Sequence, residues 1–173
     1  MVVVLLLLSG LGARVGVHET YTGFLEAARE NDVPAFITAF SGSGILEWAQ
    51  GQAWGWRASP GYMRTRVSVA GMSADLEQFS LGAGPVFYRG ENYWGGLLSV
   101  GGLGLVIKEL SGAIEAPHYG GLGTELFFGR RFWGNGLGEL TLSCSVFPVR
   151  GPLGNEKLMG FAFFGLEIGA IVF

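Results

Sequence analysis

The sequence predicts an all-β protein whose chain forms an eight-stranded, antiparallel, up-and-down transmembrane β-barrel. The first observation behind this prediction is composition: 14% of the 173 residues are charged and the mean hydropathy is +0.40, whereas a soluble domain has about 25% charged residues. The second is that no apolar run reaches the roughly 18 residues that a membrane-spanning helix needs. The best candidate covers only residues 2–8. A barrel combines both properties, because its apolar residues are spread over short strands.

The third observation is the alternation of polar and apolar residues, since successive side chains of a strand point to opposite faces. In the stretch GELTLSCSVF, residues 138–147, Glu139 and the hydroxyl residues occupy one face, and Leu140, Leu142 and Cys144 occupy the other. The predicted strands, in chain order, are residues 9–22, 45–57, 62–73, 78–88, 93–108, 119–133, 138–147 and 159–173.

The predicted connections alternate in length. Short turns built from Gly, Pro, Ser and Asn follow strands two, four and six, at residues 58–61, 89–92 and 134–136. Longer segments follow strands one, five and seven, at residues 23–44, 109–118 and 148–157. Only the link after strand three, near residues 74–77, is short where this pattern requires a long one. Short turns at one rim and longer loops at the other are typical of outer-membrane barrels.

The first long connection predicts one short helical segment, residues 24–40. Its apolar residues are spaced for one face of a helix, and Pro34 breaks or kinks it. Aromatic residues near the strand ends predict an interfacial girdle. Its members are Trp54, Trp56, Tyr62, Tyr88, Tyr93, Trp94, Tyr119 and Trp133.

The charged face of the strands is predicted to line the lumen. Apart from its charges this face carries mostly Gly, Ser and Thr, which suit the inside of a narrow barrel, while the opposite face carries Leu, Val, Ile, Phe and Ala. Buried charges must be paired, and both signs occur in similar number. The predicted lumen network is Arg14, His18, Glu47, Arg64, Arg66, Glu125, Glu139 and Glu167.

With these features the chain resembles the small eight-stranded outer-membrane barrels of the OmpA and OmpX type. The resemblance covers the whole chain and includes the last strand, FAFFGLEIGAIVF, which ends on Phe173. It implies that Phe173 belongs to a recognition signal for the barrel-assembly machinery, and that the interior charges form a closed structural network. The departure is Gly169, which lies four residues before the terminal aromatic where the family has five.

No catalytic, cofactor or metal site is predicted. A Ser-His-acid set could draw on Ser143 or Ser145 with His18 and Glu139 or Glu19, but spacing alone does not identify such a set. His118 and the single cysteine offer no cluster of metal ligands. A net charge of −3 without a basic run gives no support to nucleic-acid binding.

We therefore expect residues 1–173 to form a single domain of a bacterial outer-membrane protein. The expected role is a structural or adhesive scaffold in contact with outer-membrane lipid, with any extracellular partner bound through the loops. Two alternatives remain open: a soluble lipocalin-like barrel that binds an apolar ligand, and a lipid-modifying outer-membrane enzyme. Residues 1–12 lack the length and basic start of a secretory signal, so Met1 is not expected to be the native start.

Overall fold

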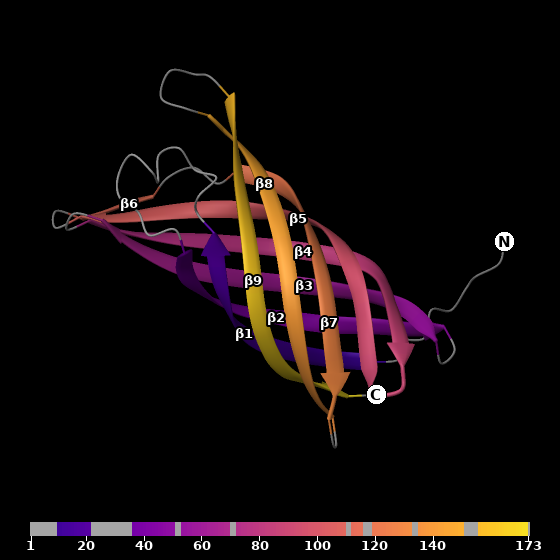
Figure 1. The fold of residues 1–173 in the computed structure, drawn as a ribbon. Helices are drawn as coiled ribbons and strands as arrows, with labels where there is room; N and C mark the ends of the chain where they lie inside the picture. Colours follow the sequence, from indigo (N-terminus) through magenta and orange to yellow (C-terminus); the bar gives the residue numbers. More distant parts are fainter. Residues whose placement is uncertain are drawn as a thin grey trace.

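The described part of the chain forms a closed antiparallel barrel in the computed structural model (Figure 1). The structure describes residues 10–21, 36–50, 53–69, 72–109, 112–115, 119–132, 135–150 and 156–172. The strands are β1 (Gly10–Tyr21), β2 (Phe36–Gln50), β3 (Trp54–Val69), β4 (Met72–Arg89), β5 (Asn92–Glu109), β6 (Gly112–Glu115), β7 (Tyr119–Arg131), β8 (Gly136–Arg150) and β9 (Glu156–Val172). The order β4-β3-β2-β1-β9-β8-β7-β5, with pairing between β4 and β5, closes a ring of eight strands. The predicted eight-stranded barrel is therefore confirmed.

The turn predicted at residues 58–61 is wrong, because these residues lie inside β3 and the chain reverses between β2 and β3 instead. Pro60 explains both the prediction and the error. Proline has no backbone N–H, and the ladder between β2 and β3 is interrupted at this point, between the pairs Ser43↔Gly61 and Leu46↔Ala58. The Ser59 hydroxyl donates a hydrogen bond of 2.9 Å to the carbonyl of Gly44, on the strand that faces the interruption. A turn-like sequence is thereby accommodated within a strand.

The helix predicted at residues 24–40 is wrong over its last five residues. β2 begins at Phe36, and the pairs from Tyr21↔Phe36 to Val17↔Phe40 place residues 36–40 in the ladder with β1. The remainder of the predicted helix lies outside the described residues. The described ranges contain no helix, and therefore no helix that is long and apolar enough to cross a membrane.

The barrel wall is apolar on the outside. Along β8 the side chains of Leu140, Leu142 and Val146 are exposed, whereas Glu139 and Thr141 are buried in the interior. The same alternation recurs around the ring, and the large apolar side chains exposed on its outer surface include Leu11, Val15, Phe79, Leu81, Leu98, Val100, Leu122, Leu126, Phe128, Phe164, Leu166 and Ile168. The alternation in the sequence predicted this inverted polarity.

The exposed apolar side chains form a belt around the barrel. On β3 and β4 this belt ends sharply on the side away from the short turns, which is called the upper side from here on. On β3 the outward residues run from Trp54 to Tyr62, and on β4 from Phe87 to Phe79, with the rings of Tyr62 and Phe79 in contact at 4.9 Å between centroids. The next outward pair is charged, Arg64↔Glu77. A nine-residue span at about 3.3 Å per residue and a tilt of about 40° corresponds to roughly 20 Å along the barrel axis, close to the apolar band of outer-membrane barrels.

Four strands extend beyond this belt. β3, β4, β5 and β6 reach past the ends of β1 and β2 and form a protruding sheet, at the left of Figure 1. In the described residues β6 pairs only with β5, from Glu109↔Gly112 to Val106↔Glu115. The predicted connection at residues 109–118 therefore contains an additional short strand.

Candidate functional site in the barrel interior

Arg14 is the first centre of the interior. It projects inward from β1, is 2% exposed, and pairs with carboxylates from three other strands. Its guanidinium lies 2.8 Å from Glu125 and 2.7 Å from Glu167, and it also contacts Glu139. Burial of a charge without partners would cost several kcal/mol, so these contacts hold β1 against β7, β8 and β9.

Arg57 is a second centre, which sequence reasoning missed. It is fully buried and lies 2.6 Å from Glu47 and 2.7 Å from Glu139, so that Glu139 joins both arginines. Its guanidinium also lies over the rings of Tyr93 and Phe127, 5.0 and 4.3 Å from their centroids. The misplaced turn after residue 57 concealed it, because Arg57 then stood at the end of a predicted strand rather than inside a real one.

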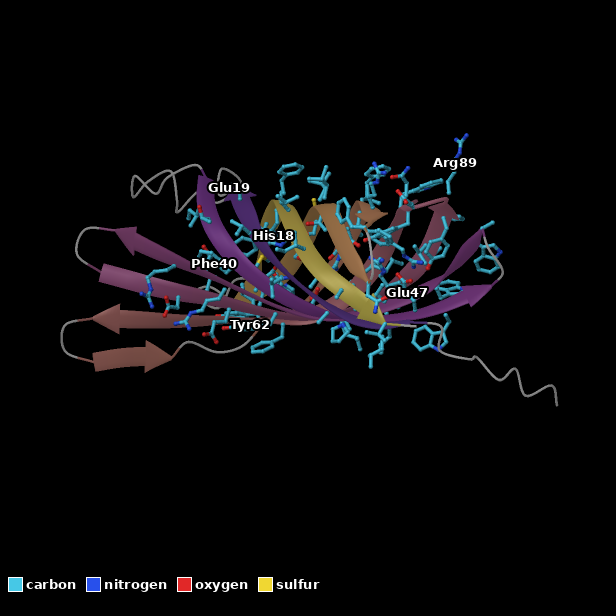
Figure 2. All side chains as sticks on the ribbon, turned by 90° about the horizontal axis from the view of Figure 1, so that it is seen from below. His18, Glu19, Phe40, Glu47, Tyr62 and Arg89 are labelled. Atoms are coloured by element: carbon cyan, nitrogen blue, oxygen red, sulfur yellow. The ribbon has the colours of Figure 1, made fainter. Side chains whose placement is uncertain are left out.

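Glu47 extends the cluster toward the rim that carries the short turns. Its second carboxylate oxygen accepts hydrogen bonds of 2.9 Å from Tyr88 and from Arg131. Tyr88 and Tyr93 are therefore not part of the predicted girdle, because their side chains contribute to the interior. His18 and Glu47 lie within the ring of strands, whereas Tyr62 lies on the outside of the wall (Figure 2).

Arg64 and Arg66 do not join the interior, and the prediction that they line the lumen is wrong. Their side chains are 44% and 58% exposed, whereas Thr65 between them is buried. They lie on the outer face of β3 above the apolar belt, where that face no longer needs apolar residues. A charged residue indicates the lumen-facing side of a strand only where that strand crosses the apolar belt. Hydrogen bonding to Asp75 raises the pKa of both guanidinium groups.

The interior is layered from one end of the barrel to the other. Along β8 the inward residues are, in order, Leu137, Glu139, Thr141, Ser143, Ser145 and Phe147. Leu137 belongs to an apolar cluster at the short-turn end, Glu139 to the ion pairs, and Phe147 to an apolar cluster at the opposite end. The members of this last cluster are Leu103, Phe147, Phe161 and Phe163, with Met63, Leu76 and Tyr119 against them.

A small polar cavity of about 60 Å³ lies between the ion pairs and the upper apolar cluster. Its lining includes Arg14, His18, Gln78, Glu125 and Glu167, together with serines from several strands.

The cavity contains a serine, a histidine and a carboxylate in contact, but not in the geometry of a catalytic triad. Ser41 and Glu167 lie 2.7 and 3.0 Å from the same ring nitrogen, Nε2 of His18. In a triad the nucleophile and the acid contact different ring nitrogens, whereas Nδ1 of His18 has no hydrogen-bond partner in the described part of the chain. Ser145 instead accepts a hydrogen bond from Gln78, and Glu19 accepts one from Thr38.

Other residues considered in the sequence give no site. Among the described residues no three His, Cys, Asp or Glu side chains are grouped to hold a metal ion. Cys144 is exposed on the outer wall. His118 and Phe173 lie outside the described residues.

An eight-stranded closed barrel with an apolar outer wall and a charged, packed interior defines a class, the small transmembrane β-barrels of outer membranes. Solved structures of this class resemble the chain over nearly its whole length. Ail of Yersinia pestis, crystallised with the heparin analogue sucrose octasulfate, has a TM-score of 0.61 at 14% identity, over 94% of this chain and 98% of Ail.

Two further structures show the same fold. Neisserial surface protein A has a TM-score of 0.61 at 10% identity, over 93% of this chain and 95% of that protein. The N-terminal β-barrel domain of Pseudomonas aeruginosa OprF has a TM-score of 0.54 at 8% identity, over 94% and 97% of the two chains. No protein-family model and no curated protein sequence matches the chain. The similarity is therefore one of fold.

Proposed function

We propose that the chain is an integral outer-membrane protein that acts as a closed scaffold and presents a binding surface at its extracellular end. The observation that carries the proposal is the inverted polarity of the wall. Leu98 and Leu122 are 74% and 68% exposed, whereas Arg14, Arg57 and Glu139 are buried. This arrangement is unfavourable in water. It is favourable when lipid surrounds the wall and the charges inside are paired.

The first test is electrophoretic mobility in SDS, with and without boiling, after refolding into detergent. A folded barrel should migrate differently from the boiled chain, and withdrawal of detergent should precipitate it. A monodisperse monomer in plain buffer would overturn the proposal and favour the lipocalin-like alternative. The interior argues against that alternative, because the ion-paired charges of Arg14, Glu125 and Glu167 border the cavity.

A closed lumen should not conduct ions at a high rate. The ion pairs of Arg14 and Arg57 cross the interior, and apolar clusters lie on both sides of them. We expect planar bilayers that contain the purified barrel to show no stable conductance of the kind that a wide porin gives. Regular large openings would contradict the closed scaffold while leaving the outer-membrane barrel intact.

The protruding sheet is the proposed surface for an extracellular partner. Backbone N–H and C=O groups at the edge of a sheet can pair with an extended peptide, and β6 pairs on one side only in the described residues. Ail was crystallised with a heparin analogue, which supports an extracellular partner for this barrel as well. We also propose that the barrel-assembly machinery recognises Phe173 as part of its assembly signal.

Replacing residues 106–117 by a two-residue turn tests this surface, because it removes β6 together with the β5 residues that pair with it and retains the ladder between β5 and β7. Bacteria that display this variant should lose adhesion to extracellular-matrix proteins or heparin, whereas the substitution Arg130→Gln at the opposite rim should not affect adhesion. Equal adhesion by the shortened variant would remove β6 from the binding surface. The lipid-modifying alternative has no comparable support, since the His18 arrangement is not that of a triad.

A further inference from the structure

The outer face of β3 and β4 carries a charged cluster that the closed scaffold does not need. Arg64 and Arg66 lie directly above the apolar belt, and both guanidinium groups contact one carboxylate, that of Asp75. The distances are 2.6 Å from Arg64 to Oδ2 of Asp75 and 2.7 Å from Arg66 to Oδ1. A second acid, Glu77, lies 3.7 Å from Arg64.

The charges of this cluster are arranged in depth. Asp75 is 1% exposed, whereas the side chains of Arg64 and Arg66 above it are 44% and 58% exposed. The charge of Asp75 is therefore covered, and the two arginines form most of the charged surface, with Glu77 29% exposed beside them. Asp75 also fixes the two guanidinium groups side by side, and a preorganised pair loses less side-chain freedom when it binds an anion.

A hollow beside the two arginines joins this charged surface to the apolar belt. It measures about 390 Å³ and is lined by Thr38, Phe40, Arg64 and Arg66. Phe40 is directly opposite Arg64 in the ladder between β2 and β3, and its ring is 66% exposed. On the other side of Phe40, Val17 of β1 continues the apolar surface.

We propose that this hollow is an external binding site for a phosphorylated glycolipid of the surrounding leaflet. The acyl chains would lie along the belt below Phe40, and a phosphate would accept hydrogen bonds from the guanidinium groups of Arg64 and Arg66. Planar guanidinium groups suit a phosphate because they can donate two parallel hydrogen bonds to it. The inference rests on the proposed outer-membrane location, since only a membrane presents such a ligand at this height.

The two acids beside the arginines favour a lipid over a free phosphate as the source of the phosphate group. Asp75 and Glu77 offset the positive charge of Arg64 and Arg66, which weakens the long-range attraction for a dissolved anion. A lipid in the same leaflet is already adjacent, and its acyl chains add apolar contact with Phe40. Binding should therefore require the phosphate and the acyl chains together.

The test uses the full chain reconstituted into phosphatidylcholine nanodiscs with a small fraction of lipid A or of dephosphorylated lipid A. The double substitution Arg64→Gln, Arg66→Gln should weaken retention of lipid A by about tenfold or more, since each arginine donates a charge-assisted hydrogen bond. Retention of the dephosphorylated lipid should not change. The matched control is Arg130→Gln, which removes a similarly exposed arginine, paired at 2.8 Å with Glu91, at the opposite rim.

The outcomes separate the site from the barrel. If the parent protein retains both lipids equally, or if Arg130→Gln has the same effect as the double substitution, the site is disproved while the barrel stands. Competition by millimolar inorganic phosphate would identify a free-anion site and also overturn the proposal. A chain that shows no heat-dependent mobility and stays soluble without detergent would instead refute the outer-membrane location itself.

Discussion

Two clusters of ion pairs lie on opposite faces of the same strand, β3. Their comparison shows that the distance between two charges does not by itself determine how much the pair contributes to stability. Inside, Arg57 lies 2.6 Å from Glu47; outside, Arg64 lies 2.6 Å from Asp75. The side chain of Arg57 is 1% exposed and that of Arg64 is 44% exposed. Equal distances therefore describe different interactions, because water screens the outer pair and cannot reach the inner one.

The inner cluster should respond most strongly when its shared carboxylate is removed. Glu139→Leu leaves Arg14 and Arg57 each short of one partner, and loss of one member of a buried pair costs about 3 to 5 kcal/mol. We expect this loss in the free energy of unfolding, measured by denaturant titration of the barrel in lipid vesicles. Glu91→Leu, at an exposed rim pair with Arg130, is the control and should leave the transition unchanged. A small effect of Glu139→Leu would mean that burial does not distinguish the clusters.

A smaller effect is expected from Gly165→Ala, which disturbs the inner cluster by volume rather than charge. A methyl group at Gly165 would overlap the imidazole of His18, which contacts Glu167. Overpacking of this kind costs about 1 to 3 kcal/mol. The same denaturant titration measures it, with Gly120→Ala as control because a Cβ at Gly120 meets nothing within 4 Å. Equal stability of the two variants would show that the His18 ring moves freely.

The smallest effect is expected from the outer cluster. Arg66→Gln removes the guanidinium group of Arg66 from Asp75, but Arg66 is more than half exposed and Arg64 remains in place. The unfolding transition should stay within error of the parent at both low and high salt. A clear loss of stability at low salt that high salt abolishes would show that the outer pair contributes to the fold, and the contrast between the two faces would weaken.

The sequence predicted the fold and several residues of the interior for one physical reason. Inside the belt, every strand must alternate between lipid and lumen, so Arg14, Glu125, Glu139 and Glu167 could be placed from parity alone, and the structure brings these four together. The same argument fails above the belt, where the outer face meets water. That is why Arg64 and Arg66 were assigned to the wrong side.

Two other errors have local causes. A proline beside a glycine usually marks a turn, and no property of residues 58–61 alone reveals that Ser59 can bridge to Gly44 instead. Spacing of apolar residues at 36, 37 and 40 fits a helix as well as a strand end, and only pairing with β1 decides between them. Arg57 was missed as a consequence of the first error rather than for lack of a signal.

The contact between Arg14 and Glu167 has a consequence for how the ring is closed. β1 and β9 are the first and last strands, and their pairing is the seam at which the two ends of the sheet meet. The ion pair between Arg14 and Glu167, at 2.7 Å, and the contact of His18 with Glu167 connect these two strands from inside the barrel. Sideways parting of the seam would separate buried opposite charges as well as break backbone hydrogen bonds. The ion pairs inside the lumen therefore stabilise the pairing of β1 with β9 and help to keep the barrel closed within the lipid.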